Sequence, residues 1–205
     1  MGVPFFKTKL SEATIQAVTD VLASGWLTSG KQVNLFEREF GEFIGGNMNA
    51  LAVNSATAGL HLVLEACGVG PGDEVIVPTL TFTASAEVVR YLDAKVVLVD
   101  IDSNTLSGDF AAIEAAITAR TKAIVFVHFG GYPVDILPLL KICERYNLRL
   151  IEDAAHAIPS RVGKQHIGTM GSDAAVFSFY ANKTMTTGEG GMIVTSNSEI
   201  AERCR

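Results

Sequence analysis

Short apolar runs alternate along the chain with longer segments whose apolar positions recur at helical spacing. Several runs are almost wholly apolar and rich in β-branched residues, as expected of strands covered on both faces. The expected strands are Leu51–Val53, Glu74–Val77, Lys95–Val99, Lys122–Val127, Leu148–Ile151, Ala174–Phe177 and Gly191–Thr195.

The segments between these runs read as amphipathic helices, because their hydrophobic residues lie three or four positions apart. Alternation of strand and helix requires crossover connections, which give a mostly parallel sheet with helices on both faces. The pattern therefore predicts an α/β protein of three layers, α/β/α, around a seven-stranded sheet. The expected helices are Ser11–Leu22, Gly59–Cys67, Ala84–Leu92, Asp109–Ile117 and Asp135–Tyr146, with Ser11, Asp109 and Asp135 as N-caps.

The 205 residues suit one large domain, residues 1–205, with no repeat or linker-like run. After the last strand, Ser196–Ser198 resemble a cap and Glu199–Arg205 the first turns of a further helix. Natural domains seldom end two turns into a helix, so we expect a domain truncated before a following part.

Composition narrows the class of protein. Hydrophobic residues make up 48% and charged residues 19% of the chain, which excludes a disordered chain. The net charge of −6 argues against nucleic-acid binding, which needs a basic face. Neither a membrane span nor a secretory leader in Met1–Lys9 is visible. Cys67, Cys143 and Cys204 fit neither a disulfide framework nor a metal site, so we expect a cytoplasmic protein without a metal.

Ligands of open parallel sheets bind beyond the carboxyl ends of the strands, so the residues that follow each strand are the candidates for chemistry. Asn54–Gly59 is small and hydroxylated and leads directly into a helix. Free amides and the helix dipole make such a start an anion site, to which Ser55 and Thr57 can add hydroxyl groups. The alternative is an ordinary Ser/Thr cap.

Two further strand ends carry ionisable residues. Asp153 ends one strand, and His156 follows three residues later; they could address one ligand, or be a capping Asp beside a core His. Lys183 lies between an apolar strand and the glycine-rich Gly188–Gly191. It is either a surface lysine or a partly desolvated amine able to form a Schiff base. Together these signals supply an anion cradle, a carboxylate for a ring nitrogen and a Schiff-base lysine, as a pyridoxal phosphate site needs.

The chain resembles a known family, the DegT/DnrJ/EryC1/StrS sugar aminotransferases, which have fold type I among pyridoxal phosphate enzymes. The resemblance covers essentially the whole chain and implies the large, cofactor-binding domain, without the C-terminal small domain that family members also have. The segments that carry it are Ser24–Phe40 (SGWLTSGKQVNLFEREF), Val53–Ser85, Val127–Asp135 (VHFGGYPVD), Leu150–Ala157 (LIEDAAHA) and Phe177–Thr195 (FSFYANKTMTTGEGGMIVT).

The resemblance implies a role for each matching position. Lys183 would form the Schiff base with pyridoxal 5′-phosphate and shuttle the proton, and Asp153 would pair with the pyridine nitrogen. Asn182 precedes the lysine, where family members usually carry Thr. The remaining matches are His156 near the phenolic oxygen, Phe82 stacked on the ring, Ala56, Thr57 and Ser178 at the phosphate, and Gly25–Gly30 (GWLTSG) close to the active site.

The function implied is transfer of an amino group, with glutamate as the expected donor, to a keto-sugar nucleotide in cell-surface polysaccharide biosynthesis. The resemblance also implies a homodimer with shared sites. Within the family, sugar dehydratases replace the Schiff-base lysine with histidine, so Lys183 argues against that variant. Two alternatives remain. One is a truncated or regulatory relative that binds cofactor without turnover, and the other is a Rossmann-like nucleotide binder, which the absence of a glycine fingerprint disfavours.

Overall fold

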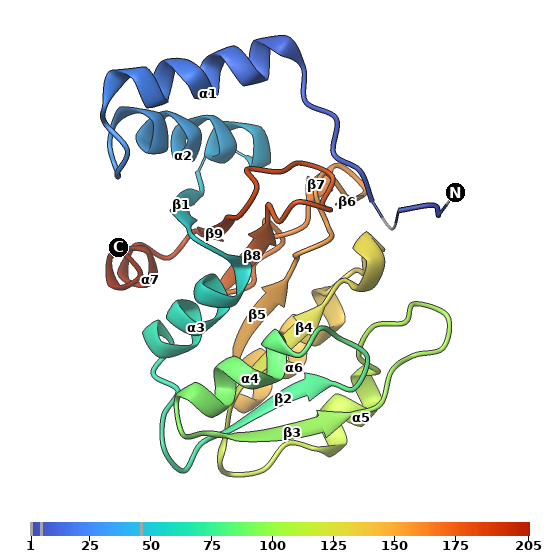
Figure 1. Cartoon of the computed structure of the whole chain (residues 1–205). Coiled ribbons are helices and arrows are strands. Elements are labelled where there is room, and N and C mark those ends of the chain that lie inside the picture. Colours follow the sequence, from blue (N-terminus) through green and yellow to red (C-terminus); the bar gives the residue numbers. More distant parts are fainter. Residues whose placement is uncertain (1, 5, 46) are drawn as a thin grey trace.

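Seven strands form one sheet between two layers of helices (Figure 1) in the computed structural model, which describes residues 2–4, 6–45 and 47–205. The helices are α1 (Glu12–Ser24), α2 (Lys31–Ile44), α3 (Ala56–Ala66), α4 (Ala84–Tyr91), α5 (Phe110–Ala115), α6 (Leu137–Tyr146) and α7 (Ser198–Arg203), with a 3₁₀ turn, η1 (Phe129–Gly131). The strands are β1 (Asn49–Val53), β2 (Glu74–Pro78), β3 (Lys95–Val99), β4 (Thr121–Val127), β5 (Arg149–Asp153), β6 (Arg161–Val162), β7 (Gln165–His166), β8 (Ala174–Ser178) and β9 (Gly191–Thr195).

The sheet has the strand order β1-β9-β8-β5-β4-β2-β3. Strand β9 runs antiparallel to both of its neighbours, whereas the other pairings in this sheet are parallel. Strands β6 and β7 form a separate antiparallel pair. The predicted three-layer, mostly parallel, seven-stranded architecture is therefore confirmed. Its consequence is that the carboxyl ends of six strands meet at one edge of the sheet.

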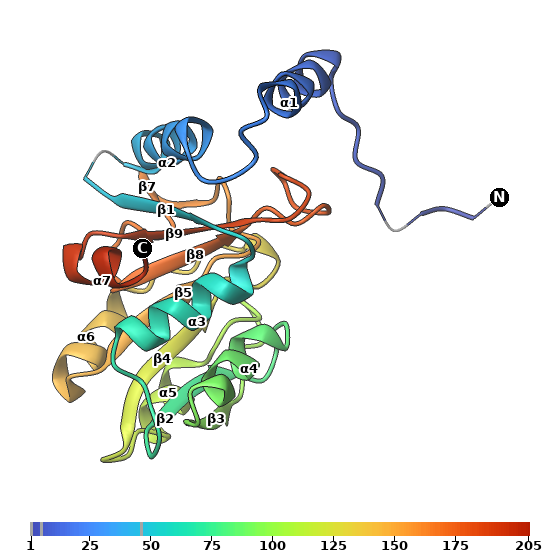
Figure 2. The same cartoon turned by 60° about the vertical axis from the view of Figure 1, so that its left-hand side comes forward.

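The two faces of the sheet bury different helices (Figure 2). One core contains residues of α2, α5 and α6 packed on strand residues such as Phe126 and Phe177. The other contains residues of α3, α4 and α7 packed on strand residues such as Val125 and Val176. Successive strand residues point to opposite faces, so nearly every position of the central strands is buried. This explains why those strands read as continuous apolar runs.

Helix starts differ from expectation in an informative way. Helix α3 begins at Ala56 rather than Gly59, because the Ser55 hydroxyl accepts a hydrogen bond from the Ala58 amide and caps it. Asp135 was expected to be the N-cap of α6, and this prediction is wrong, because the helix begins at Leu137 and its N-cap is Ile136. The Asp135 carboxylate nevertheless accepts a hydrogen bond from the Leu137 amide at 2.9 Å. The predicted caps Ser11 and Asp109 are confirmed.

Helix α2 was not predicted from the hydrophobic pattern. It begins after Gly30 without a side-chain cap, and its sequence is strongly charged. The residues of α2 that are buried are Phe40, Gly41 and Ile44. Packing of Phe40 on Phe177 and Phe179 stabilises this helix on the sheet, and tertiary contact of this kind outweighs local propensity.

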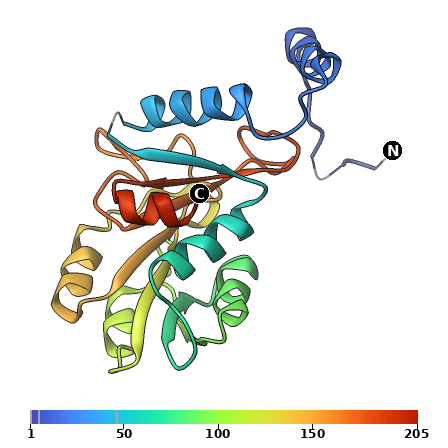
Figure 3. The same cartoon turned by 90° about the vertical axis from the view of Figure 1, so that its left-hand side faces the viewer.

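Helix α1 lies apart from the layers, as Figure 3 shows, and none of its residues is buried. The apolar stripe of Ile15, Val18 and Leu22 that predicted the helix is more than half exposed. The connection that follows carries Trp26 and Leu27, which are 64% and 66% exposed. The pattern thus predicted the helix correctly, but its apolar face does not contact the two cores.

The described part of the chain contains no helix with both the length and the apolar character that crossing a bilayer requires. Met1 and Phe5, in the segment Met1–Lys9 where no leader was expected, lie outside the described residues. The cysteines are free and buried, and burial raises the pKa of Cys67 and Cys143 to about 12 and that of Cys204 to about 11. Such thiols are poor nucleophiles.

Candidate active site

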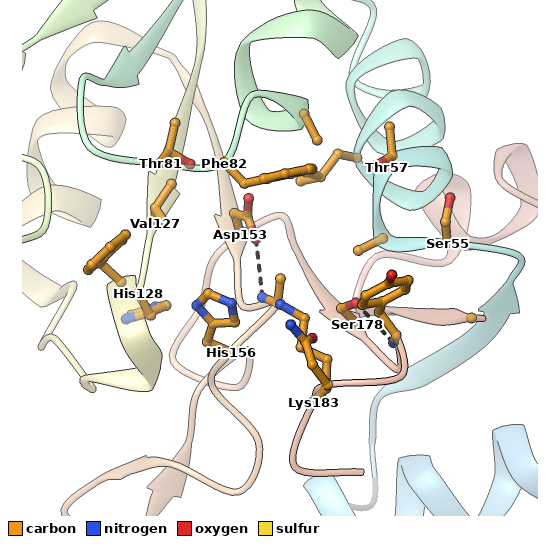
Figure 4. A pocket seen from close by; sticks show the side chains of 18 of the residues that line it. Ser55, Thr57, Thr81, Phe82, Val127, His128, Asp153, His156, Ser178 and Lys183 are labelled. Carbon is orange, nitrogen blue, oxygen red and sulfur yellow. Dashed lines mark hydrogen bonds between the residues drawn. The ribbon is translucent and has the colours of Figure 1, made fainter. Parts of the chain in front are cut away.

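A cavity of about 440 Å³ opens at the edge of the sheet where the carboxyl ends of β1, β2, β4, β5 and β8 meet. It is lined by residues from the connections that follow these strands and by the turn before β9. Figure 4 shows Phe82 and Lys183 on opposite sides of Asp153, with Ser55, Thr57 and Ser178 to one side and His156 to the other. A volume of this size is typical of small-molecule sites.

The start of α3 forms one wall of this cavity. Ser55 is the N-cap, and Ala56 and Thr57 open the helix and line the cavity. Backbone N–H groups of a first helical turn have no partner within the helix and carry the positive end of its dipole. Ser178, a buried residue at the end of β8, adds a hydroxyl group. This wall, called the anion wall below, carries the groups that an anion site needs.

Glycine allows β9 to approach that wall closely. A Cβ atom on Gly191 would lie 2.7 Å from the Ala56 nitrogen and 2.8 Å from the Ser55 carbonyl carbon. Only a residue without a side chain fits beside the first turn of α3 at this distance. Packing against the anion wall therefore requires glycine at position 191, in addition to any role of the glycine-rich segment in forming the turn.

The buried carboxylate of Asp153 lies at the centre of the cavity. Its Oδ2 atom accepts a hydrogen bond from the Ser85 hydroxyl at 2.6 Å, and its Oδ1 atom accepts from the Ala155 amide at 3.1 Å. Because Ser85 has one proton to donate, the Thr81 hydroxyl, 2.7 Å away, donates to Ser85 in turn. Hydrogen bonds from Ser85 of α4 and from the end of its own strand thus orient the carboxylate, which lines the cavity.

Lys183 and His156 lie on the remaining sides of the cavity. Burial lowers the pKa of the Lys183 amine, and the nearby Asp153 carboxylate partly opposes this effect. Burial also lowers the pKa of His156, and the positive charge of Lys183 adds to that, whereas Asp153 opposes it. A lysine with a lowered pKa has more of its amine in the nucleophilic, uncharged form near neutral pH.

The residues around the cavity fit pyridoxal phosphate. An aldehyde needs an uncharged amine, a pyridine nitrogen needs a carboxylate, and a phosphate needs backbone amides and hydroxyl groups. Lys183, Asp153 and the start of α3 with Ser178 supply these in turn. Phe82, 73% exposed, offers an apolar ring face on the wall opposite Lys183 (Figure 4). Among the described residues no group of His, Cys, Asp and Glu side chains could hold a metal ion.

The cavity is lined by the following residues predicted from the sequence: Ser55, Ala56, Thr57, Phe82, Asp153, His156, Ser178 and Lys183. Gly25–Gly30, by contrast, does not line the cavity within the described part of the chain. Sequence reasoning missed Thr81 and Ser85, although a hydroxyl group on the inner, apolar face of α4 is a signal that could have been read. It also missed the role of Glu152, which is fully buried beside Asp153.

Comparison with known proteins places this geometry in a family. The model of the DegT/DnrJ/EryC1/StrS aminotransferase family matches residues 8–205. The spore coat polysaccharide biosynthesis protein SpsC of Bacillus subtilis (strain 168) is 46% identical over 203 residues, which are 99% of this chain and 52% of SpsC. The chain therefore spans about half the length of this curated relative.

Solved structures give the same picture. Spr1654 of Streptococcus pneumoniae, described as a sugar aminotransferase and solved in its PLP form, superposes with a TM-score of 0.92 at 34% identity, covering 100% of this chain and 57% of that one. DesI, solved in the presence of its TDP-sugar product, superposes with a TM-score of 0.86 at 38% identity, covering 93% of this chain and 48% of that one.

Proposed function

The chain belongs to the DegT/DnrJ/EryC1/StrS aminotransferase family, and from this membership we propose that it is the cofactor-binding large domain of a pyridoxal phosphate-dependent sugar aminotransferase. The fold is that of the fold type I enzymes, as its structural neighbours indicate. The observation that carries the proposal is one cavity that is lined by the Lys183 amine, by the Asp153 carboxylate, whose charge acts on that amine, and by the start of α3.

The cofactor supplies an electron sink, which stabilises negative charge on the carbon that loses a proton. The chain's own residues would hold and tune it. The first-turn amides of α3 and the Ser178 hydroxyl would bind the phosphate. Asp153, held by Ser85 and Ala155, would accept a hydrogen bond from the ring nitrogen and keep that nitrogen protonated. Phe82 would cover one face of the ring and exclude water from it.

Lys183 would hold the cofactor and move a proton with the same atom. Its Nζ, partly buried and with a lowered pKa, would hold the cofactor covalently at its aldehyde carbon, and as a free amine it would accept and return the proton of the reacting carbon. His156, whose pKa is also lowered, would stay uncharged near neutral pH beside the phenolic oxygen. In this form one ring nitrogen can accept or donate a hydrogen bond without adding a second positive charge.

We assign a keto-sugar nucleotide as the amino acceptor and glutamate as the donor. The support for the acceptor is the name of SpsC, a spore coat polysaccharide biosynthesis protein, and the TDP-sugar product with which DesI was solved. Glutamate as the donor rests on the family resemblance alone. Cytoplasmic localisation belongs to the same proposal, and the free, buried cysteines are compatible with a reducing compartment.

We also propose a homodimer. The exposed apolar stripe of α1 and the exposed Trp26 and Leu27 form a large apolar surface for a soluble chain. The Gly25–Gly30 segment resembles one that lies close to an active site, yet it does not line the cavity of its own chain. A second copy of the chain could bring these residues to its partner's cavity, as sites shared between subunits require.

Trapping of the cofactor tests the proposed function. The chain incubated with pyridoxal phosphate and then reduced with borohydride should carry the label on the peptide that contains Lys183. Lys183→Arg should lose the label, whereas Lys164→Arg, at an exposed lysine outside the cavity, should keep it. Label on another lysine, or on none, would remove the assignment. Light scattering of the same protein decides the homodimer separately.

A further inference from the structure

A fully buried polar network adjoins the cavity, which His128 helps to line, and it is not used by the proposed chemistry. Glu152 precedes Asp153 on β5, and its side chain points to the opposite face of the sheet, toward the core that contains α5 and α6. There its Oε2 atom lies 2.7 Å from His128 Nε2, and its Oε1 atom accepts from the Ser172 hydroxyl at 2.5 Å. The side chains of Glu152 and His128 are both 0% exposed.

The hydrogen bonds fix the orientation and tautomer of His128. The Val134 amide donates to His128 Nδ1 at 3.3 Å. Nδ1 therefore holds a lone pair, and Nε2 carries the proton that it donates to Glu152. His128 also packs edge-on against Phe126, with ring centroids 5.4 Å apart. Its ring can satisfy Glu152 and Val134 together in this orientation only.

Through Val134 the network closes the turn that follows β4. His128 begins this turn, which includes η1, and its ring accepts from the backbone at the turn's far end. The His128 carbonyl also accepts from the Gly131 amide at 3.0 Å. The backbone and the side chain of His128 thus each hold part of the turn, and Glu152 holds that side chain in place.

The tip of the turn rests on the backbone of a cavity residue. Gly131 has a φ of 83°, and a Cβ atom at this position would lie 2.4 Å from the His156 carbonyl oxygen. The Gly131 carbonyl accepts from the Ser160 hydroxyl at 2.7 Å, which ties the turn to the segment after His156. No side chain separates the turn from His156, so displacement of one displaces the other.

We propose that Glu152 is a positioning residue that, through His128 and the turn ending at Val134, fixes the backbone of His156 and so the place of its ring beside Lys183 and Asp153. The Glu152 side chain acts on His128 from the face of the sheet opposite the Asp153 carboxylate. The inference rests on the proposed function for its purpose, the precise presentation of His156 to the cofactor. Its structural part stands on the contacts of the chain alone.

The first test needs no cofactor. The chain has four histidines, and NMR of their imidazole groups in the cofactor-free chain can follow each ring once it is assigned by substitution. In Glu152→Gln the His156 ring should change its chemical shift and titrate at a higher pH than in wild type, because it moves away from the positive charge of Lys183. Thr195→Val, which removes a buried hydrogen bond to Asp173 at the opposite edge of the sheet, should leave His156 unchanged.

Cofactor binding supplies the second readout. Glu152→Gln should weaken pyridoxal phosphate binding about tenfold, the order of effect of a lost hydrogen bond to a charged group, and should change the pH at which the absorption of the bound cofactor shifts. His128→Phe should act in the same direction, and the double variant should be no worse than the worse single variant, because both act through one path. Additive effects would overturn the proposal.

A milder variant covers the case in which the buried substitutions prevent folding. Ser160→Ala removes the hydrogen bond to Gly131 at the partly exposed end of the path, and it should shift the His156 titration in the same direction by a smaller amount. A wild-type His156 titration in folded Glu152→Gln, or in Ser160→Ala if the former is unfolded, overturns the proposal. Failure of the wild-type chain to take up pyridoxal phosphate would instead contradict the proposed function and leave the NMR result decisive for positioning.

Discussion

The Ser85 hydroxyl donates a 2.6 Å hydrogen bond to Asp153 Oδ2, joining α4 to the end of β5 across 68 residues of sequence. Ser85 is fully buried, and Asp153 is 5% exposed. In a buried environment such a bond both stabilises the carboxylate and fixes the direction of its free lone pairs. The orientation of Asp153 therefore depends on a helix that the local sequence around Asp153 does not reveal.

Ser85→Ala should weaken pyridoxal phosphate binding about tenfold, because a hydrogen bond to a charged group contributes roughly 1.5–3 kcal/mol and 1.4 kcal/mol is about one decade. Equilibrium dialysis of the cofactor measures this effect. Ser107→Ala is the matched control, since the Ser107 hydroxyl is buried without a hydrogen-bond partner among the described residues. Equal affinities of the Ser85 and Ser107 variants would show that Ser85 does not orient Asp153.

The lowered pKa of Lys183 predicts a pH profile. Burial favours the uncharged amine, so attachment of pyridoxal to Lys183, trapped with borohydride, should reach half its maximal rate below the value of about 10.4 that an ordinary lysine has. Asp153 raises the pKa of Lys183. Asp153→Asn should therefore move the midpoint to a still lower pH.

Peptide mapping across a series from about pH 6 to about pH 11 follows that profile at Lys183. A midpoint at Lys183 at or above about pH 10.4 would contradict the effect of burial. A midpoint that rises in Asp153→Asn would contradict the assigned direction of the interaction between the carboxylate and the amine.

The fold could be predicted from the sequence because strands covered by helices on both faces consist of continuous runs of apolar residues. The residues at their carboxyl ends follow from topology, since a parallel sheet gathers these ends at one edge. The sequence pattern could therefore predict Asp153, Lys183 and the start of α3 as parts of one site. All of them line the cavity.

What the sequence could not supply depends on contacts between distant segments. Helix α2 is stabilised by Phe40 against Phe177 and Phe179, a contact that no local pattern encodes. The pairing of Glu152 with His128 joins adjacent strands across a separation of 24 residues, and a lone Glu in an apolar strand gives no hint of its partner. The exposed face of α1 looks identical in sequence to a buried one.

His166 predicts a loss of stability in mild acid. Its side chain is buried, and neither ring nitrogen has a hydrogen-bond partner among the described residues. Burial lowers its pKa, and the positive charge of Arg161 lowers it further, whereas the Ser160 backbone partly opposes both effects. The folded state thus binds this proton more weakly than the unfolded state, so its contribution to stability is present above about pH 6.5 and is lost as the pH falls toward the folded pKa.

His166→Phe should remove this loss, because a phenyl ring can pack against Phe43, whose ring lies 4.9 Å from that of His166, without taking up a proton. Urea unfolding between about pH 7 and about pH 5 should show a shallower decline of stability in this variant than in wild type. His61→Gln controls for the loss of one histidine. An unchanged decline in His166→Phe would place the acid sensitivity elsewhere.

The last prediction concerns the contact between β9 and the anion wall. A Cβ atom at Gly191 would meet the Ala56 nitrogen at 2.7 Å, the Ser55 carbonyl carbon at 2.8 Å and the Phe177 oxygen at 3.0 Å. These are backbone atoms, so rotation of a side chain cannot relieve the clash. Either β9 or the first turn of α3 has to move.

Gly191→Ala should therefore destabilise the chain by about 1–3 kcal/mol, the usual cost of overpacking, and should also weaken binding of inorganic phosphate, because the amides of Ala56 and Thr57 would be displaced. Urea unfolding and calorimetric titration with phosphate measure the two effects. Gly70→Ala is the control, since a Cβ atom there has no neighbour within 4 Å and should change neither quantity. A destabilised Gly191→Ala that binds phosphate with wild-type affinity would separate packing from the anion site and remove the start of α3 from the proposed phosphate contacts.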